Sequence, residues 1–122
     1  MVEVICDTSF LIHLATKRIK NIDNIDVEIG QVTFVVPQVV QNELSELIKN
    51  PLKNQTALVT RDFIKNFKII SISGNFADKE LIDYVKKNGS IIGTMDKELK
   101  KQIKEHGGSI MSFSNDKIVL ES

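Results

Sequence analysis

The sequence has few of the residues on which several common classes of protein depend. The single cysteine, Cys6, excludes an internal disulfide and a zinc site built from cysteines. No apolar run approaches the ~20 residues that span a bilayer, and no charged-then-apolar leader is seen, so we expect a cytoplasmic protein with no membrane partner. Tryptophan is absent and Tyr84 is the only tyrosine, which gives little sign of aromatic stacking on single-stranded bases.

The chain also lacks an excess of charge of either sign. Sixteen basic and sixteen acidic residues cancel, so no overall field attracts nucleic acid or an anionic membrane. Arg18 and Arg61 are the only arginines, so planar guanidinium recognition of phosphates or bases is limited. A polyanionic partner would have to be held by a local patch or through a metal ion.

What the sequence does contain is a regular alternation of short apolar segments with segments of helical spacing. With 122 residues and an apolar fraction of 42%, we expect one domain over residues 1–122. The predicted strands are Val2–Cys6, Thr33–Val36, Ile69–Ile72, Ser90–Gly93 and Ile110–Phe113, with the final KIVLES as a candidate edge strand. The predicted helices are Phe10–Thr16, Gln38–Lys49, Thr56–Phe67, Ala77–Asn88 and Lys97–Glu105. This alternation predicts a three-layer α/β/α fold around a mostly parallel, five-stranded sheet.

The expected sheet brings two carboxylates together. In a doubly wound sheet the first and fourth strands are neighbours, and ligands bind at their carboxyl ends. Asp7 follows the first predicted strand and Asp96 lies just past the fourth, so we expect them to face each other. A simpler interpretation of the first acid is that Asp7, Thr8 or Ser9 caps the following helix.

Two further acids lie within the apolar arc of a predicted helix. Glu43 falls inside the stripe of the 38–49 segment, whereas Glu46 falls just outside it, and Asp78 lies within the arc of the 77–88 segment. Structural explanations exist, because an acid is favoured in the first turn of a helix and a side chain at the edge of a stripe can reach water. Four convergent acids would nevertheless repel one another unless a cation lay among them. Hard oxygen ligands without cysteine or histidine suit Mg²⁺ or Mn²⁺.

The order and context of these acids resemble the four acidic blocks of PIN-domain nucleases. Asp7 lies in VICDTSFLI, Glu43 in VVPQVVQNEL, Asp78 in FADKELIDYV and Asp96 in IIGTMDKELKK. The resemblance extends from Val2 to about Phe113. It is closest to short archaeal PIN proteins similar to rRNA-processing nucleases, and next closest to VapC-type toxins.

The resemblance implies a metal-dependent endoribonuclease that hydrolyses RNA phosphodiester bonds. Asp7, Glu43, Asp78 and Asp96 would be the catalytic residues and would bind one or two Mg²⁺ or Mn²⁺ ions, as in metal-assisted hydrolysis. Thr8, Ser9 and Thr94 would support them by hydrogen bonding. The implied partners are RNA, a second copy of the chain in a homodimer, and either an antitoxin or a ribosome-assembly partner.

Basic residues follow two of the acids and are candidate RNA contacts. They are Lys97, Lys100, Lys101 and Lys104 after the fourth acid, and Lys17, Arg18 and Lys20 after the first. Such contacts to the RNA backbone would weaken with salt. The alternative is a solvated lysine face, which is the ordinary state of surface lysines.

Three alternatives to the nuclease hypothesis are considered. An aspartyl-phosphate-forming phosphatase normally needs a second Asp two positions after the first, where this chain has Ser9. A receiver domain would need an Asp at the tip of the third strand, and the IISISGNF segment has none. A non-cutting PIN scaffold is disfavoured by four retained acids, but Met95 replaces an Asn common before the fourth acid, and Lys79 replaces a second acid found after the third in relatives of the rRNA-processing type.

Overall fold

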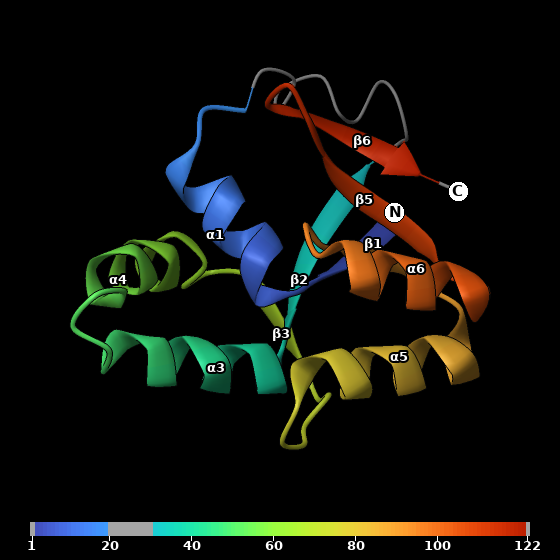
Figure 1. Ribbon diagram of the computed structural model, residues 1–122, viewed down its shortest axis with the longest axis horizontal. Coiled ribbons are helices and arrows are strands. Elements are labelled where there is room, and N and C mark those ends of the chain that lie inside the picture. Colours follow the sequence, from blue (N-terminus) through green and yellow to red (C-terminus); the bar gives the residue numbers. More distant parts are fainter. Residues whose placement is uncertain (1, 20–30, 122) are drawn as a thin grey trace.

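The computed structural model describes residues 2–19 and 31–121 (Figure 1). The predicted RNA contact Lys20 lies outside the described residues. The elements in chain order are β1 (Val2–Cys6), α1 (Thr8–Thr16), β2 (Val32–Pro37), α3 (Gln38–Ile48), α4 (Asn54–Phe63), β3 (Lys68–Ile70), α5 (Ala77–Asn88), β4 (Ile91–Gly93), α6 (Lys97–Glu105), β5 (Ser109–Ser114) and β6 (Lys117–Glu121).

The sheet has the order β3-β2-β1-β4-β5-β6, and its first five strands in chain order pair in parallel. The predicted α/β fold is therefore confirmed. Helices α1, α3 and α4 contact one another, as do α5 and α6, and right-handed crossovers place these two groups on opposite faces (Figure 1). β1 and β4 are neighbours, with Cys6 opposite Gly93, so the switch point lies where it was predicted.

The prediction of five strands was one too few, because the candidate edge strand at the end of the sequence forms β6 over Lys117–Glu121. This strand pairs antiparallel with β5 through a tight turn whose central residues, Asn115 and Asp116, have φ values of 52° and 59°. Asn and Asp tolerate this left-handed conformation better than other residues with side chains, and a two-residue loop of this kind matches the strand twist. The hairpin contacts α1 as well, since the rings of His13 and Phe113 stack with centroids 4.2 Å apart.

Helix α4, predicted over Thr56–Phe67, ends earlier than expected. It was expected to run to Phe67 but stops at Phe63, after which the N–H of Phe67 donates to the carbonyl of Ile64 in a tight turn. The turn lets Phe67 pack against Phe63 and Phe34, with ring centroids 5.5 Å and 6.4 Å apart. Because Phe67 is spaced like a residue of the helix, the apolar pattern continued past the true end of α4. Strand β3 starts one residue earlier than expected, at Lys68.

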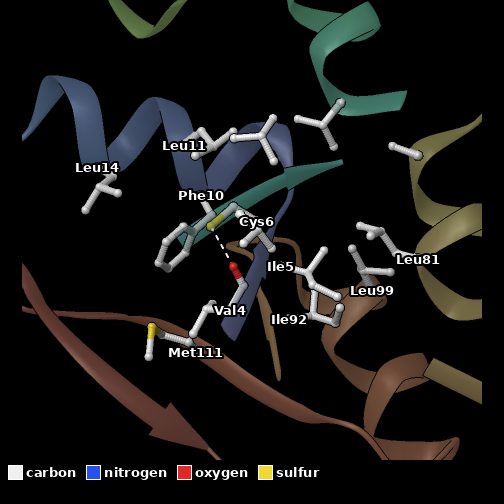
Figure 2. Close-up of a cluster of buried hydrophobic side chains, with 14 of the residues drawn as sticks. Val4, Ile5, Cys6, Phe10, Leu11, Leu14, Leu81, Ile92, Leu99 and Met111 are labelled. Carbon is white, nitrogen blue, oxygen red and sulfur yellow. Dashed lines mark hydrogen bonds between the residues drawn. The ribbon is translucent and has the colours of Figure 1, made fainter. Parts of the chain in front are cut away.

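The core is built around β1, in which Val4, Ile5 and Cys6 are buried (Figure 2). Leu11 on α1 and Leu81 on α5 cover the two sides of the sheet. Burial raises the pKa of the Cys6 thiol, and neighbouring Asp7 raises it further, which keeps the thiol neutral and unreactive. Among the described helices none is long and apolar enough to cross a bilayer.

Candidate active site

Asp7 is held rigidly at the tip of β1. Its backbone N–H donates to the carbonyl of Gly93 at 2.9 Å, which ties the ends of β1 and β4 together. Its Oδ1 accepts from Ser9 Oγ at 2.8 Å and from the N–H of Phe10 at 2.9 Å, while Oδ2 accepts from Thr94 Oγ1. Of the three predicted capping residues, Asp7, Thr8 and Ser9, Asp7 is therefore the one that caps α1. Ser9 lies inside the first turn of α1, where its hydroxyl supports Asp7.

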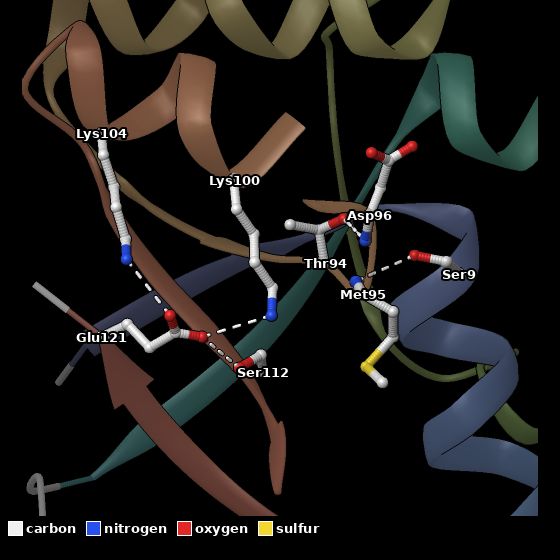
Figure 3. Close-up of polar contacts among 8 residues, drawn as sticks. All are labelled: Ser9, Thr94, Met95, Asp96, Lys100, Lys104, Ser112 and Glu121. Atoms are coloured by element: carbon white, nitrogen blue, oxygen red, sulfur yellow. Dashed lines mark hydrogen bonds and ion pairs between the residues drawn. The ribbon is translucent and has the colours of Figure 1, made fainter. Parts of the chain in front are cut away.

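The segment after β4 brings Asp96 to the same place (Figure 3). The buried Thr94 accepts from the N–H of Asp96 at 3.1 Å while its hydroxyl donates to Asp7, so one side chain connects both acids. The N–H of Met95 donates to Ser9 Oγ at 3.1 Å, and this contact needs only the backbone. Asp96 caps α6 through the N–H groups of its first turn and remains exposed.

The two helical acids reach the site from α3 and α5. Glu43 is half-buried, and its Oε1 accepts from Thr8 Oγ1 at 2.6 Å. Asp78 lies in the first turn of α5 and is exposed at the rim. Glu46, the acid predicted to point outward, is exposed and pairs with Lys49 at 3.2 Å.

All four predicted acids line one pocket of about 280 Å³ at the carboxyl ends of β1 and β4. Its lining consists of Asp7, Thr8, Ser9, Ile12, Glu43, Ala77, Asp78 and Asp96. The segments that supply the acids are far apart in the sequence and meet only through the fold. Thr94, the remaining predicted supporting residue, is buried beside this acid pocket and acts on it through Asp7.

The acids influence one another electrostatically. Burial raises the pKa of Asp7; hydrogen bonds from Thr94, Phe10 and Ser9 oppose this shift, and the charge of Asp78 adds to it. The pKa of Asp78 is also raised, first by partial burial and then by the charges of Asp96 and Glu43. A carboxylate that is harder to ionise because of its neighbours is one that a cation would stabilise.

The chemistry of the donor set fits a hard divalent cation, but the acids are spread around an open pocket. Across residues 2–19 and 31–121, no three His, Cys, Asp or Glu side chains form a compact group that could hold a metal ion by themselves. Mg²⁺ commonly keeps several of its waters and is held by one or two carboxylates together with substrate phosphates. An open pocket with four carboxylates therefore fits such an ion better than it fits zinc.

Another cavity is larger, at about 690 Å³, but it lies at the opposite ends of β1, β4 and β5. Among the described residues that line it, Glu3 is the only one with a carboxylate, and it pairs with Lys68 at 2.6 Å. Size alone therefore does not locate the chemistry in this molecule.

The structure gives two of the candidate RNA-binding lysines another partner. Lys100 and Lys104 lie 3.3 Å and 3.1 Å from the carboxylate of Glu121 on β6, which also accepts from Ser112 Oγ at 2.5 Å (Figure 3). This pairing was not predicted, because β6 was only a candidate edge strand and was not counted in the five-stranded sheet. The remaining candidates are exposed, namely Lys17, Arg18, Lys97 and Lys101.

The Glu121 cluster predicts a pH-dependent contribution to stability. Hydrogen bonding by Ser112, Lys104 and Lys100 lowers the pKa of Glu121 to about 2, so its charge stabilises the fold above its ordinary value of 4.5 and this stabilisation is lost as the pH falls towards 2. We expect Glu121→Gln to lower the free energy of unfolding at pH 7 by up to about 1 kcal/mol, since the group is partly exposed. Urea unfolding at pH 7 and pH 3 should show a smaller difference at pH 3, and an equal difference at both would contradict this account.

Comparison with known proteins agrees with this geometry. Residues 4–115 match the family described as a PIN like domain. The chain belongs to the PIN-like domain family. The PIN domain described here is 31% identical over 121 residues to ribonuclease VapC4 of Methanocaldococcus jannaschii, an alignment that covers 91% of this chain and 89% of that protein.

The fold of this PIN domain is also similar to a solved structure, that of the PIN domain endonuclease Utp24. The TM-score is 0.75 at 24% sequence identity, with 98% of this chain and 90% of the other covered. At this identity the likeness shows the fold alone. The predicted PIN-family membership is confirmed, and the roles of the individual acids remain predictions.

Two exposed apolar residues, Phe76 and Leu52, were not predicted as candidate functional residues. Phe76 directly precedes Ala77 and Asp78 and is 71% exposed, although the prediction considered only tyrosine and tryptophan as stacking residues. Leu52 is 94% exposed. An apolar residue in a segment rich in Gly, Pro and Asn was the available signal, because such segments usually lie at the surface.

Proposed function

We propose that this PIN domain is an endoribonuclease that depends on Mg²⁺ or Mn²⁺. The observation that carries the proposal is the meeting of four carboxylates from distant segments in one pocket, where the pKa values of Asp7 and Asp78 are raised. Neutral replacements would stabilise such a pocket if it had only a structural purpose. Retaining four acids there is understandable if a cation and a phosphate bind among them.

Within this proposal, Asp7, Glu43, Asp78 and Asp96 would hold the cation. When bound, the ion would lower the pKa of a water molecule and offset the negative charge of the phosphate. The task of the surrounding residues is to keep the carboxylates in place: Thr94 and Ser9 donate to Asp7, and Thr8 donates to Glu43. Ligand orientation by such neighbours is typical of metal sites.

RNA is the proposed substrate because the relative with 31% identity is named a ribonuclease. The exposed cations Lys97 and Lys101 on α6 and Lys17 and Arg18 after α1 are the proposed backbone contacts. Binding should therefore weaken as salt is raised. Lys100 and Lys104 would contribute less, because Glu121 neutralises part of their charge.

The proposal is tested by the cleavage of a labelled RNA with Mn²⁺ or Mg²⁺. We expect cleavage by the wild type, none after chelation, and a loss on the order of a hundredfold or more in Asp96→Asn. Glu98→Gln is the matched control, since Glu98 lies two residues further along the same helix and contacts Gln102. Absence of cleavage under all conditions would favour a non-cutting scaffold, and equal loss in both variants would remove the special role of Asp96.

Thr94 provides a second test of the same site. Thr94→Val removes the hydroxyl that donates to Asp7 and accepts from the N–H of Asp96, while keeping the side-chain shape. We expect a ~10–100-fold loss of cleavage, as for other residues that orient metal ligands. Thr94→Ser keeps the hydroxyl and should retain most of the activity. Equal rates in the Val and Ser variants would contradict the orienting role.

For the biological role we propose a toxin of a toxin–antitoxin pair, with an antitoxin as partner, because the relative named VapC4 is similar along nearly the whole chain. The rRNA-processing role implied by the sequence resemblance is the second candidate. Expression of the wild type alone should arrest growth, and expression of Asp7→Asn should not. Unimpeded growth with active, soluble enzyme would favour RNA processing instead.

A further inference from the structure

A second hollow adjoins the acid pocket on the side of α1, α3 and α4. This apolar pocket has a volume of about 230 Å³ and is lined by Ile12, Leu47, Leu52, Lys53, Thr56 and Ala57. Ile12 lines both the acid pocket and the apolar pocket, so the two pockets adjoin at this side chain. Figure 1 shows the three helices side by side.

Leu52 is the most unusual part of this wall. It is 94% exposed, yet its backbone is fixed: Asn50 Oδ1 accepts from the N–H of Leu52 at 2.9 Å, and the Asn50 carbonyl accepts from the N–H of Lys53 at 3.0 Å. Pro51, inside this turn, removes further backbone freedom. Because the backbone of this turn is already fixed, little backbone entropy is lost when a ligand covers Leu52, which is a property of binding sites that are organised in advance.

We propose, on the basis of the proposed ribonuclease function, that the apolar pocket holds a nucleobase next to the phosphate being cleaved. In one nucleotide the base and the phosphate are joined through a single sugar. The apolar pocket, which would hold the base, and the acid pocket, which would hold the phosphate, likewise adjoin at Ile12. Base faces bind apolar side chains when a nucleotide is unstacked. The same nucleotide can therefore occupy both pockets.

The polar members of the pocket fit this occupant. Lys53 makes no ion pair and the Thr56 hydroxyl makes no hydrogen bond within the part of the chain that the structure describes. The ammonium of Lys53 can contact an adjacent phosphate, and the hydroxyl of Thr56 can donate to or accept from a base edge. An apolar wall with a few polar groups is the usual composition of a small-ligand site.

The size of the pocket suits a nucleobase. Its volume of about 230 Å³ lies below the ~300–1,000 Å³ of sites for drug-sized ligands, and a single base is smaller than such a ligand. Leu52 and Lys53 are thus assigned as specificity-determining residues, since both belong to the lining that a bound base would contact.

The test is a double-mutant cycle between Leu52 and the base. One short RNA oligonucleotide and its counterpart with abasic riboses on both sides of the cleaved bond are compared on the wild type, Leu52→Ala, and the matched control Leu120→Ala. Leu120 is also exposed but lies on β6 at the far edge of the sheet. We expect either removing the base or making Leu52→Ala to lower kcat/KM about tenfold, and the two together to lower it no further.

Binding of the same oligonucleotides, followed by fluorescence anisotropy in the Asp7→Asn background, repeats the cycle without cleavage. Wild-type protein that cuts neither oligonucleotide would overturn the ribonuclease function, whereas the binding cycle would still decide the base pocket. Independent, multiplying losses in both measurements, or Leu52→Ala that behaves like Leu120→Ala, would overturn the pocket's assignment to a base. In that case the exposed leucine would belong to a protein contact.

Discussion

Asp7→Asn is expected to abolish RNA cleavage and, in metal-free buffer, to make the protein more stable. Asn keeps an oxygen for the hydrogen bonds from Ser9 and Phe10, but it removes a buried charge whose pKa is raised above its ordinary value of 3.8. We expect cleavage to fall on the order of a hundredfold or more. The free energy of unfolding should rise by about 1 kcal/mol, in the direction often seen when a functional site is neutralised.

The pH dependence of this difference follows from the sign of the pKa shift. Because folding raises the pKa of Asp7, the folded protein holds this proton more tightly, and stability falls as the pH rises through the folded-state pKa. The gain in Asp7→Asn should therefore be small near pH 3 and full at pH 7. Asp62→Asn, which changes an exposed acid on α4, should show no such gain. An Asp7→Asn protein that is less stable than wild type at pH 7 would contradict the proposed electrostatic cost.

Gly93→Ala is expected to cause the largest loss of stability among the changes near the site. A Cβ at this position would lie 2.9 Å from Cγ of Phe10 and 3.0 Å from both Cδ atoms. The Phe10 ring is fully buried and contacts Phe113 and Phe34, with centroids 4.8 Å and 5.9 Å away, so it has little room to move. Overpacking of this kind typically costs ~1–3 kcal/mol, which urea unfolding would measure.

The clash with Phe10 can be tested separately from other effects of the alanine. If the ring is the obstacle, Phe10→Leu should cost less in the Gly93→Ala background than in the wild type, giving a favourable coupling energy. Cleavage should also fall in Gly93→Ala, because the Gly93 carbonyl accepts from the N–H of Asp7. If the two substitutions lower the free energy of unfolding additively, contact with the Phe10 ring is not the cause of the loss in Gly93→Ala.

The four acids could be located from the sequence because two simple rules meet at them. Parallel strands bring their carboxyl ends to one edge, which predicted that Asp7 and Asp96 would meet, and helical periodicity identified Glu43 and Asp78 as acids turned towards the protein. Each rule depends on local pattern, and the first needed only the strand order. The pocket lined by these residues therefore agrees with expectations that used no coordinates.

Features that depend on long-range or side-chain geometry were not predictable in this way. Glu121 lies beside Lys100 and Lys104 only because β6 turns back beside β5, and the short pattern of this candidate edge strand did not predict its strand partner. The sequence made no prediction for Leu52, whose 94% exposure depends on how the turn at Pro51 directs the chain. The apolar pocket likewise required the relative positions of three helices.

The central claim is that the acid pocket is one cation site. Calorimetric titration of metal-free protein with Mn²⁺ tests it directly, comparing the wild type with Asp7→Asn and with the control Glu46→Gln. Glu46 lies on α3 like Glu43, but it pairs with Lys49, whereas Glu43 accepts from Thr8 in the acid pocket. We predict saturable Mn²⁺ binding in the wild type and in Glu46→Gln, and its loss or strong weakening in Asp7→Asn. Equal Mn²⁺ binding by all three proteins, or no binding by the wild type, would contradict the account.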